Sequence, residues 1–148
     1  MKRLQNKVTI ITGASSGIGR ATAKLFAEED AHVYLCDIQD EMGEELTAEI
    51  VKSGGHANYC HLDVRNEDEW IAALNKILDI HGRIDILVNN AGIGGAPIHL
   101  KIEDYPVDQW DKTIAINATG VFLGTKQAAR FMKQTGGCLL NTSDAADE

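Results

Sequence analysis

The stretch "KVTIITGASSGIGRATAKLF", residues 7–26, decides the fold of this chain. It begins with a short apolar run, 7–12, rich in β-branched side chains, which is typical of a strand buried on both faces. Three glycines follow, and from Ile18 onward apolar residues recur at the spacing of one helix face, at Ile18, Ala21, Leu25 and Phe26. A strand, a glycine-rich turn and a helix in this order predict the start of an α/β domain.

The same alternation continues along the rest of the chain. Further strands are expected at 32–37, 56–63, 84–90 and 137–141. Helices are expected around 42–50, after an N-cap at Asn66 that pairs with Glu69 as in a capping box, and over 106–134 with a bend near Gly120. Strands that alternate with helices predict a doubly wound parallel sheet, for which we expect the order 3-2-1-4-5.

Composition limits the function classes. The 148 residues suffice for one domain over 1–148, and 44% hydrophobic residues exclude a disordered chain. A net charge of −8 argues against nucleic acid or an anionic membrane as partner. We expect neither a membrane span nor a secretory signal, because no apolar run is long enough. The three scattered cysteines, Cys36, Cys60 and Cys138, favour a reducing, cytoplasmic setting with each thiol buried as a small hydrophobe.

The glycine-rich turn has the form G-x-x-x-G-x-G, at Gly13, Gly17 and Gly19, so the general dinucleotide pattern G-x-G-x-x-G is not met. Glycines nevertheless allow a tight turn in which backbone N–H groups approach a pyrophosphate. The helix that follows directs its positive end to the same place. We therefore expect a nucleotide site here, with an ordinary glycine-rich turn as the alternative.

Asp37 closes the second expected strand. In a doubly wound fold an acid near this place hydrogen-bonds the 2′-OH of the adenosine ribose and would repel a 2′-phosphate. Residue 38 is Ile, and no Arg or Lys lies between Gly13 and Gly19. The sequence therefore favours NAD over NADP, while a turn-forming aspartate is the alternative.

Asn117 and the histidines are the remaining polar candidates for a site. Asn117 follows Ile114 by three positions and Trp110 by seven, which predicts a place on the core-facing side of its helix, where the amide needs a partner. The histidines show no metal-ligand spacing with cysteines or acids, so we expect no metal site and surface or loop positions for His32, His56, His61, His81 and His99.

"TGASSGIG" (12–19), Asp37, "LDV" (62–64), "NNAG" (89–92) and Asn117 together resemble the short-chain dehydrogenase/reductase family, over essentially the whole chain. The resemblance implies an oxidoreductase that moves hydride between NAD and a secondary alcohol or ketone. It also implies a homo-oligomer assembled through helices like those at 104–134. The cofactor-binding residues that it implies are Gly13, Ser15, Ser16, Gly17, Ile18, Gly19, Asp37, Ile38, Asp63, Val64, Asn90, Ala91 and Gly92, with Asn89 as structural support.

The resemblance also implies catalytic residues, and here the chain departs from the family pattern. Asn117 matches the place that holds a water in a proton relay. The family's general acid/base is a Tyr followed four residues later by a Lys, but Tyr34, Tyr59 and Tyr105 are followed at that distance by Ile38, Asp63 and Gln109. The place of the family's catalytic serine falls on Asp144, which leaves Ser143 as the candidate.

We therefore expect 1–148 to be an NAD-binding Rossmann-like domain that is truncated, lacks the family's later strands and is nearly inactive by itself. Two alternatives remain open. One is a non-catalytic module that binds or senses NAD. The other is a subunit completed by another chain.

Overall fold

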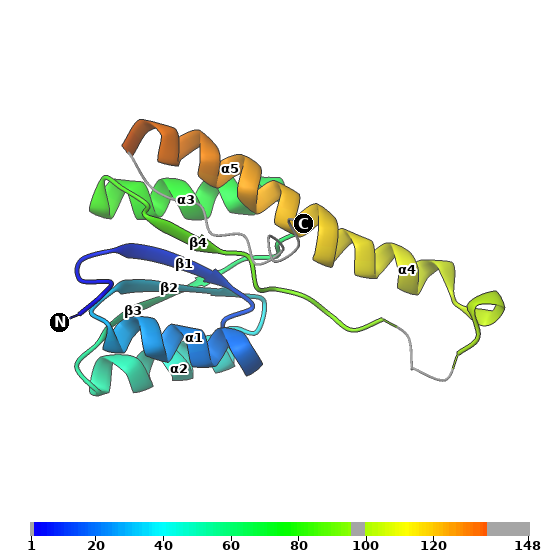
Figure 1. Ribbon diagram of the computed structural model, residues 1–148, viewed down its shortest axis with the longest axis horizontal. Helices are drawn as coiled ribbons and strands as arrows, with labels where there is room; N and C mark the ends of the chain where they lie inside the picture. Colours follow the sequence, from blue (N-terminus) through cyan, green and yellow to red (C-terminus); the bar gives the residue numbers. More distant parts are fainter. Residues whose placement is uncertain (1, 96–99, 136–148) are drawn as a thin grey trace, which may run out of the picture.

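The computed structural model describes residues 2–95 and 100–135. Its centre is one parallel sheet in the order β3-β2-β1-β4 (Figure 1), made of β1 (Val8–Thr12), β2 (His32–Asp37), β3 (His56–His61) and β4 (Ile86–Val88). This order confirms the doubly wound α/β fold. The strand expected at 137–141 lies outside the residues that the structure describes.

Helices cover both faces of the sheet (Figure 1). One face carries α1 (Gly17–Glu28) and α2 (Asp40–Lys52), and the other carries α3 (Glu67–His81) and α5 (Gly120–Thr135). Successive strand residues point to opposite faces, so each strand contributes to two cores. In β1, for example, Ile11 packs on the α1–α2 side and Ile10 on the α3–α5 side. No helix in the described ranges is both long and apolar enough to cross a bilayer.

The start of α3 confirms the cap predicted from the sequence. The side-chain oxygen of Asn66 accepts hydrogen bonds from the backbone N–H groups of Asp68 at 3.1 Å and Glu69 at 3.4 Å. Its amide nitrogen donates to the Glu69 carboxylate at 2.9 Å. Directly behind the cap, the fully buried Trp70 donates its indole N–H to the carbonyl of Val64 at 3.0 Å, which ties α3 to the chain leaving β3.

The long helical segment is interrupted just before Gly120. α4 (Val107–Ile114) passes through a π-helical turn (Ala115–Thr119) into α5. Gly120 lies so close to β3's exit that a Cβ there would stand 2.7 Å from Val64 Cγ2. α4 extends past the sheet (Figure 1), and this part of the chain has exposed apolar side chains at Ile102, Val107, Trp110, Ile114 and Phe122.

The described histidines lie at the ends of strands and helices rather than in loops, and His56 and His61 are exposed, as expected of surface positions. His32 and His56 begin neighbouring strands, His61 ends β3 and His81 ends α3, while His99 is outside the described residues. The rings of His32 and His56 stack at 4.7 Å, and Tyr34 Oη lies 2.9 Å from His81 Nε2. In the ranges that the structure describes, no three histidine, cysteine or acidic side chains are arranged as metal ligands.

Candidate functional site

A cavity of about 640 Å³ lies at the carboxyl ends of the strands. Its walls come from the glycine-rich turn, from the segments that leave β2, β3 and β4, and from α4 with the π-helical turn. The predicted residues that line it are Gly13, Ser16, Gly17, Ile18, Asp37, Ile38, Asp63, Val64, Asn90, Ala91 and Gly92. Ser15, Gly19 and Asn117 are not part of the lining, and Ser143 falls outside the described residues.

The glycines of the turn are needed for two different reasons. Gly13 and Gly17 have φ values of 62° and 52°, in the left-handed region that favours glycine. Gly19 lies inside α1, where a Cβ would overlap the carbonyl oxygen of Gly13 and stand 2.6 Å from Asn90 Nδ2. Gly19 therefore lets α1 pack against the turn, while Gly13 and Gly17 shape the surface that faces the cavity.

The chain leaving β4 is fastened to the glycine-rich turn by hydrogen bonds. Asn90 donates its side-chain amide to the carbonyls of Thr12 at 2.9 Å and Gly13 at 3.1 Å. In return, Thr12 Oγ1 accepts the backbone N–H groups of Asn90 and Ala91, both at 3.0 Å. Asn89 points the other way and donates to Thr125 Oγ1 of α5 at 3.2 Å. The two asparagines thus position the β4 exit between the turn and α5.

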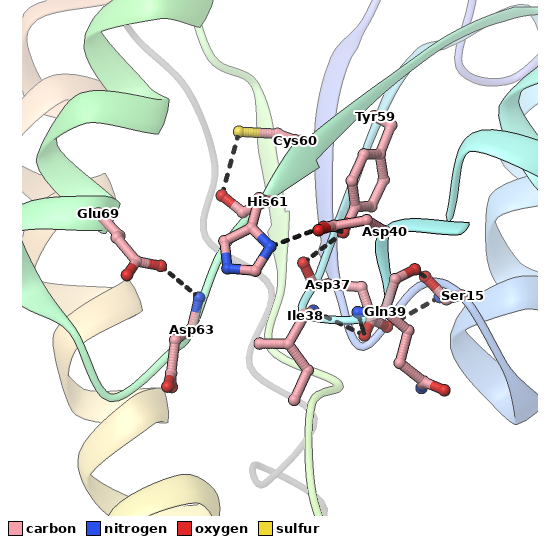
Figure 2. A network of polar contacts seen from close by, with 10 residues as sticks. All are labelled: Ser15, Asp37, Ile38, Gln39, Asp40, Tyr59, Cys60, His61, Asp63 and Glu69. Carbon is pink, nitrogen blue, oxygen red and sulfur yellow. Dashed lines mark hydrogen bonds and ion pairs between the residues drawn. The ribbon is translucent and has the colours of Figure 1, made fainter. Parts of the chain in front are cut away.

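The Asp37 carboxylate joins the glycine-rich turn to the end of β2 (Figure 2). One oxygen accepts the backbone N–H of Ser15 at 2.9 Å. The other accepts those of Ile38 at 2.8 Å and Gln39 at 3.1 Å. Asp37 is 6% exposed and lines the cavity. A carboxylate offers about four lone-pair sites, so one acceptor site remains on the oxygen that holds Ser15.

A second polar network supports the residues that follow Asp37 (Figure 2). The Tyr59 hydroxyl lies 2.7 Å from the carbonyl oxygen of Asp37 and 2.6 Å from Asp40 Oδ1, and it donates to one of them at a time. His61 Nδ1 approaches the same Asp40 oxygen at 2.6 Å. The Tyr59 ring packs over Gly43 of α2, where an added Cβ would overlap it.

The network changes the acid–base behaviour of its members. The hydrogen bond to Asp40 raises the pKa of His61 above its ordinary value. The pKa of Asp40 is lowered, first by the hydrogen bond from Tyr59 and then by that from His61. Burial and the neighbouring Asp40 raise the pKa of Tyr59. Tyr59 therefore remains a neutral donor, and the His61–Asp40 contact becomes an ion pair when His61 is protonated.

The wall that follows β3 contains a cation that sequence reasoning missed. Arg65 Nε donates to the Asp63 carboxylate at 2.9 and 3.1 Å, and this pairing lowers the pKa of Asp63. The backbone N–H of Asp63 in turn donates to Glu69 at 2.7 Å. Arg65 could have been noticed as the residue that follows the "LDV" stretch. The lining residues that the prediction omitted are Gln39, Leu62, Arg65, Ile93, Lys112 and Ile116.

Asn117 is exposed, so its predicted core-facing position is wrong. The physical reason is that α4 extends past the sheet, so the helix face marked by Trp110 and Ile114 is itself exposed rather than packed on the core. Its amide instead holds the β4 exit: Oδ1 accepts the backbone N–H of Ile93 and Nδ2 donates to the Ile93 carbonyl, both at 2.9 Å.

Comparison with known proteins gives consistent matches. A family model described as short chain dehydrogenase matches residues 7–147. An uncharacterized oxidoreductase YxbG of Bacillus subtilis is 45% identical over 97% of this chain and 52% of its own length. A cyclopentanol dehydrogenase of a Comamonas species is 41% identical, over 97% of this chain and 56% of that protein.

Solved structures agree with this result. The crystal structure of a short-chain type dehydrogenase/reductase from Mycobacterium marinum superimposes with a TM-score of 0.86 at 34% identity. It is matched over 93% of this chain and 56% of that one. The chain thus spans about half the length of the curated relatives it matches.

The His61–Asp40 pair predicts a pH-dependent stability. Because the folded-state pKa of His61 is raised above the value of about 6.5 for an unfolded chain, the pair stabilises the fold fully below about pH 6.5. This stabilisation is lost as the pH rises through the raised pKa. Urea titrations should therefore show His61→Gln less stable than the parent protein at pH 6, with a smaller difference at pH 9.

The control is the same substitution in an Asp40→Asn background, where the pH-dependent difference should vanish. The assignment of His61 as the protonated partner would be contradicted if the parent protein and His61→Gln differed in free energy of unfolding equally at both pH values, or more at pH 9.

Proposed function

The chain belongs to the short-chain dehydrogenase/reductase family, and from this premise we propose that its cavity binds NAD(H). We further propose that it is the cofactor-binding part of an oxidoreductase that moves hydride between NAD and a secondary alcohol or ketone. Family and fold imply a nicotinamide nucleotide, and ligands of doubly wound sheets bind outside the carboxyl ends of the strands. The cavity lies at that edge.

The glycine-rich turn supports binding of the pyrophosphate. Gly13, Ser16 and Gly17 line the cavity at the point where α1 begins. The first N–H groups of a helix have no partner within the helix, and its dipole favours an anion there. Backbone at Gly13 and Gly17 carries no Cβ, so a phosphate can approach it closely.

Asp37 is the observation that carries the preference for NAD. Its remaining acceptor site suits one hydroxyl of the adenosine ribose, as a hydrogen bond from O–H to carboxylate. A 2′-phosphate would bring negative charge next to a buried carboxylate. Arg65, which could otherwise receive such a phosphate, is paired with Asp63.

The remaining assignments follow from the family. We propose that Asn117 and Ser143 take part in catalysis. Ser15 and Gly19 support the glycine-rich turn that binds the cofactor, and residues 1–148 form one cofactor-binding domain. The name of the cyclopentanol dehydrogenase, which refers to a secondary alcohol, supports that substrate class. The exposed apolar side chains of α4 and α5 support a homo-oligomer, and the free thiols of Cys36 and Cys60 support a cytoplasmic setting.

A non-catalytic NAD-binding module, or a subunit completed by another chain, is the second candidate function. The observation that favours it is the lack of a Tyr followed four residues later by a Lys anywhere in the 148 residues. Both functions share the same cofactor site, and turnover separates them.

Nucleotide titrations test the cofactor assignment. NADH should bind more tightly than NADPH in calorimetry. Asp37→Ala should weaken NADH binding about 10- to 100-fold, because a hydrogen bond to a charged group contributes roughly 1.5–3 kcal/mol, and it should narrow the preference over NADPH. Asp37→Asn keeps one acceptor oxygen for backbone N–H groups. It therefore separates the loss of the hydrogen bond to the ribose from a change in the conformation of the glycine-rich turn.

Glu41→Ala is the matched control, since Glu41 is an exposed acid in the first turn of α2 and should leave both affinities unchanged. NADPH binding that equals or exceeds NADH binding would refute the preference.

Turnover tests whether the 148 residues are catalytic. We expect no NADH formation above background when the chain is mixed with NAD and cyclopentanol or other secondary alcohols, because no matched general acid/base pair is present. The same preparation must bind NADH, which shows that the cofactor site is folded. Turnover that Asn117→Ala or Ser143→Ala abolishes would show instead that this chain holds a different acid/base.

A further inference from the structure

Cys36 and Cys60 occupy paired positions on neighbouring strands. In the parallel register of β2 and β3, Cys36 lies directly opposite Cys60. Paired residues of adjacent strands project to the same face of a sheet, and both thiols pack in the core cluster on the α3–α5 side. Cys36 is 1% exposed, but Cys60 is only partly buried. The expectation of a buried hydrophobe therefore holds for Cys36 and is wrong for Cys60.

We propose that Cys60 is a modification site that exchanges with low-molecular-weight disulfides, and that Cys36 is the buried partner thiol that keeps it reactive. Neither cysteine is among the residues that line the nucleotide cavity. The two sites are nevertheless close in sequence, because Asp37 follows Cys36 and Asp63 lies three positions beyond Cys60.

The surroundings of Cys60 favour its thiolate. A hydrogen bond with Cys36 is the largest influence, and together with the cations Lys76 of α3 and His61 of β3 it lowers the pKa of Cys60 to about 7, against the opposing effects of burial and of Glu69. The same hydrogen bond and complete burial raise the pKa of Cys36. Of the two thiols, Cys60 is therefore the one that ionises first as the pH rises, and Cys36 keeps its proton.

The protonated form of Cys60 has a weaker alternative contact. Its sulfur lies 3.7 Å from the carbonyl oxygen of His61 (Figure 2), to which a thiol proton can donate. An S–H group is only a weak donor, so this contact does little to hold the proton on Cys60.

The chemistry is a thiol–disulfide exchange. The Cys60 thiolate attacks one sulfur of a small disulfide, the new bond joins Cys60 Sγ to that sulfur, and the original S–S bond breaks. The second sulfur leaves as a thiolate with the bonding electron pair and takes a proton from water. Cys60 and the small molecule then form a mixed disulfide, Cys36 remains a thiol, and an excess of small thiol reverses the reaction.

Reaction with 5,5′-dithiobis(2-nitrobenzoate), followed at pH 5.5–9.5 through the released thiolate, tests the proposal. Cys138→Ser is used throughout, so that Cys36 and Cys60 are the remaining cysteines. One equivalent should react in a fast phase whose rate is half-maximal near pH 7, and mass spectrometry should find the adduct on residue 60. Cys60→Ala should abolish this phase.

Cys36→Ala, which removes the hydrogen-bond donor, should raise the midpoint by about one pH unit, toward the ordinary cysteine value of about 8.5. Lys76→Gln, on the exposed side of α3, should raise the pH midpoint of the fast phase by less. If Cys36→Ala does not fold, this variant tests the proposal in its place. The proposal is overturned by a midpoint at or above 8.5 in the parent protein, by a fast phase that survives Cys60→Ala, or by a midpoint that neither variant moves.

Discussion

The site depends above all on one buried carboxylate. Asp37 accepts backbone N–H groups from Ser15, Ile38 and Gln39, and so fixes the glycine-rich turn against the end of β2. An unpaired charge would be costly at this depth, but three hydrogen bonds from backbone N–H groups compensate it. The negative charge is therefore fixed at the cavity wall with one acceptor site left over, which ties the local fold directly to the proposed recognition of a ribose.

Two further anchors hold the other walls. Four hydrogen bonds join Asn90 and Ala91 of the β4 exit to Thr12 and Gly13 of the turn. The amide of Asn117 holds the backbone of Ile93 through two more. Tyr59 supports the segment after Asp37 from β3. Each anchor joins segments that are distant in sequence, so the walls of the cavity are positioned by the sheet rather than by any single loop. Such preorganisation reduces the ordering that a bound nucleotide would otherwise require.

Sequence patterns predicted the features that depend on hydrophobic period and on neighbouring residues, such as the positions of strands. The strand at 32–37 was placed to the residue, because a strand buried on both faces is a continuous apolar run. The strand expected at 84–90 is shorter, Ile86–Val88, because side chains replace ladder partners at both ends: the Asp85 carboxylate accepts the N–H of Val8, and Thr12 Oγ1 accepts that of Asn90. Asn117 was expected to face the core because a helical period cannot show that α4 extends past the sheet, where Trp110 and Ile114 are exposed as well. The Tyr59–Asp40–His61 network joins side chains of α2 and β3, and no spacing along one element could show it.

The most direct test of the account is a map of backbone amide chemical shifts during titration of the chain with NADH. If Asp37 organises a dinucleotide site, the largest changes should fall on 13–19, on Ile38 and Gln39, and on the segments 63–65 and 90–92. The chemical shifts of the amides at the amino ends of the strands, near His32 and His56, should remain unchanged. Changes centred on those histidines or on α4 alone, with the glycine-rich turn unaffected, would contradict the account.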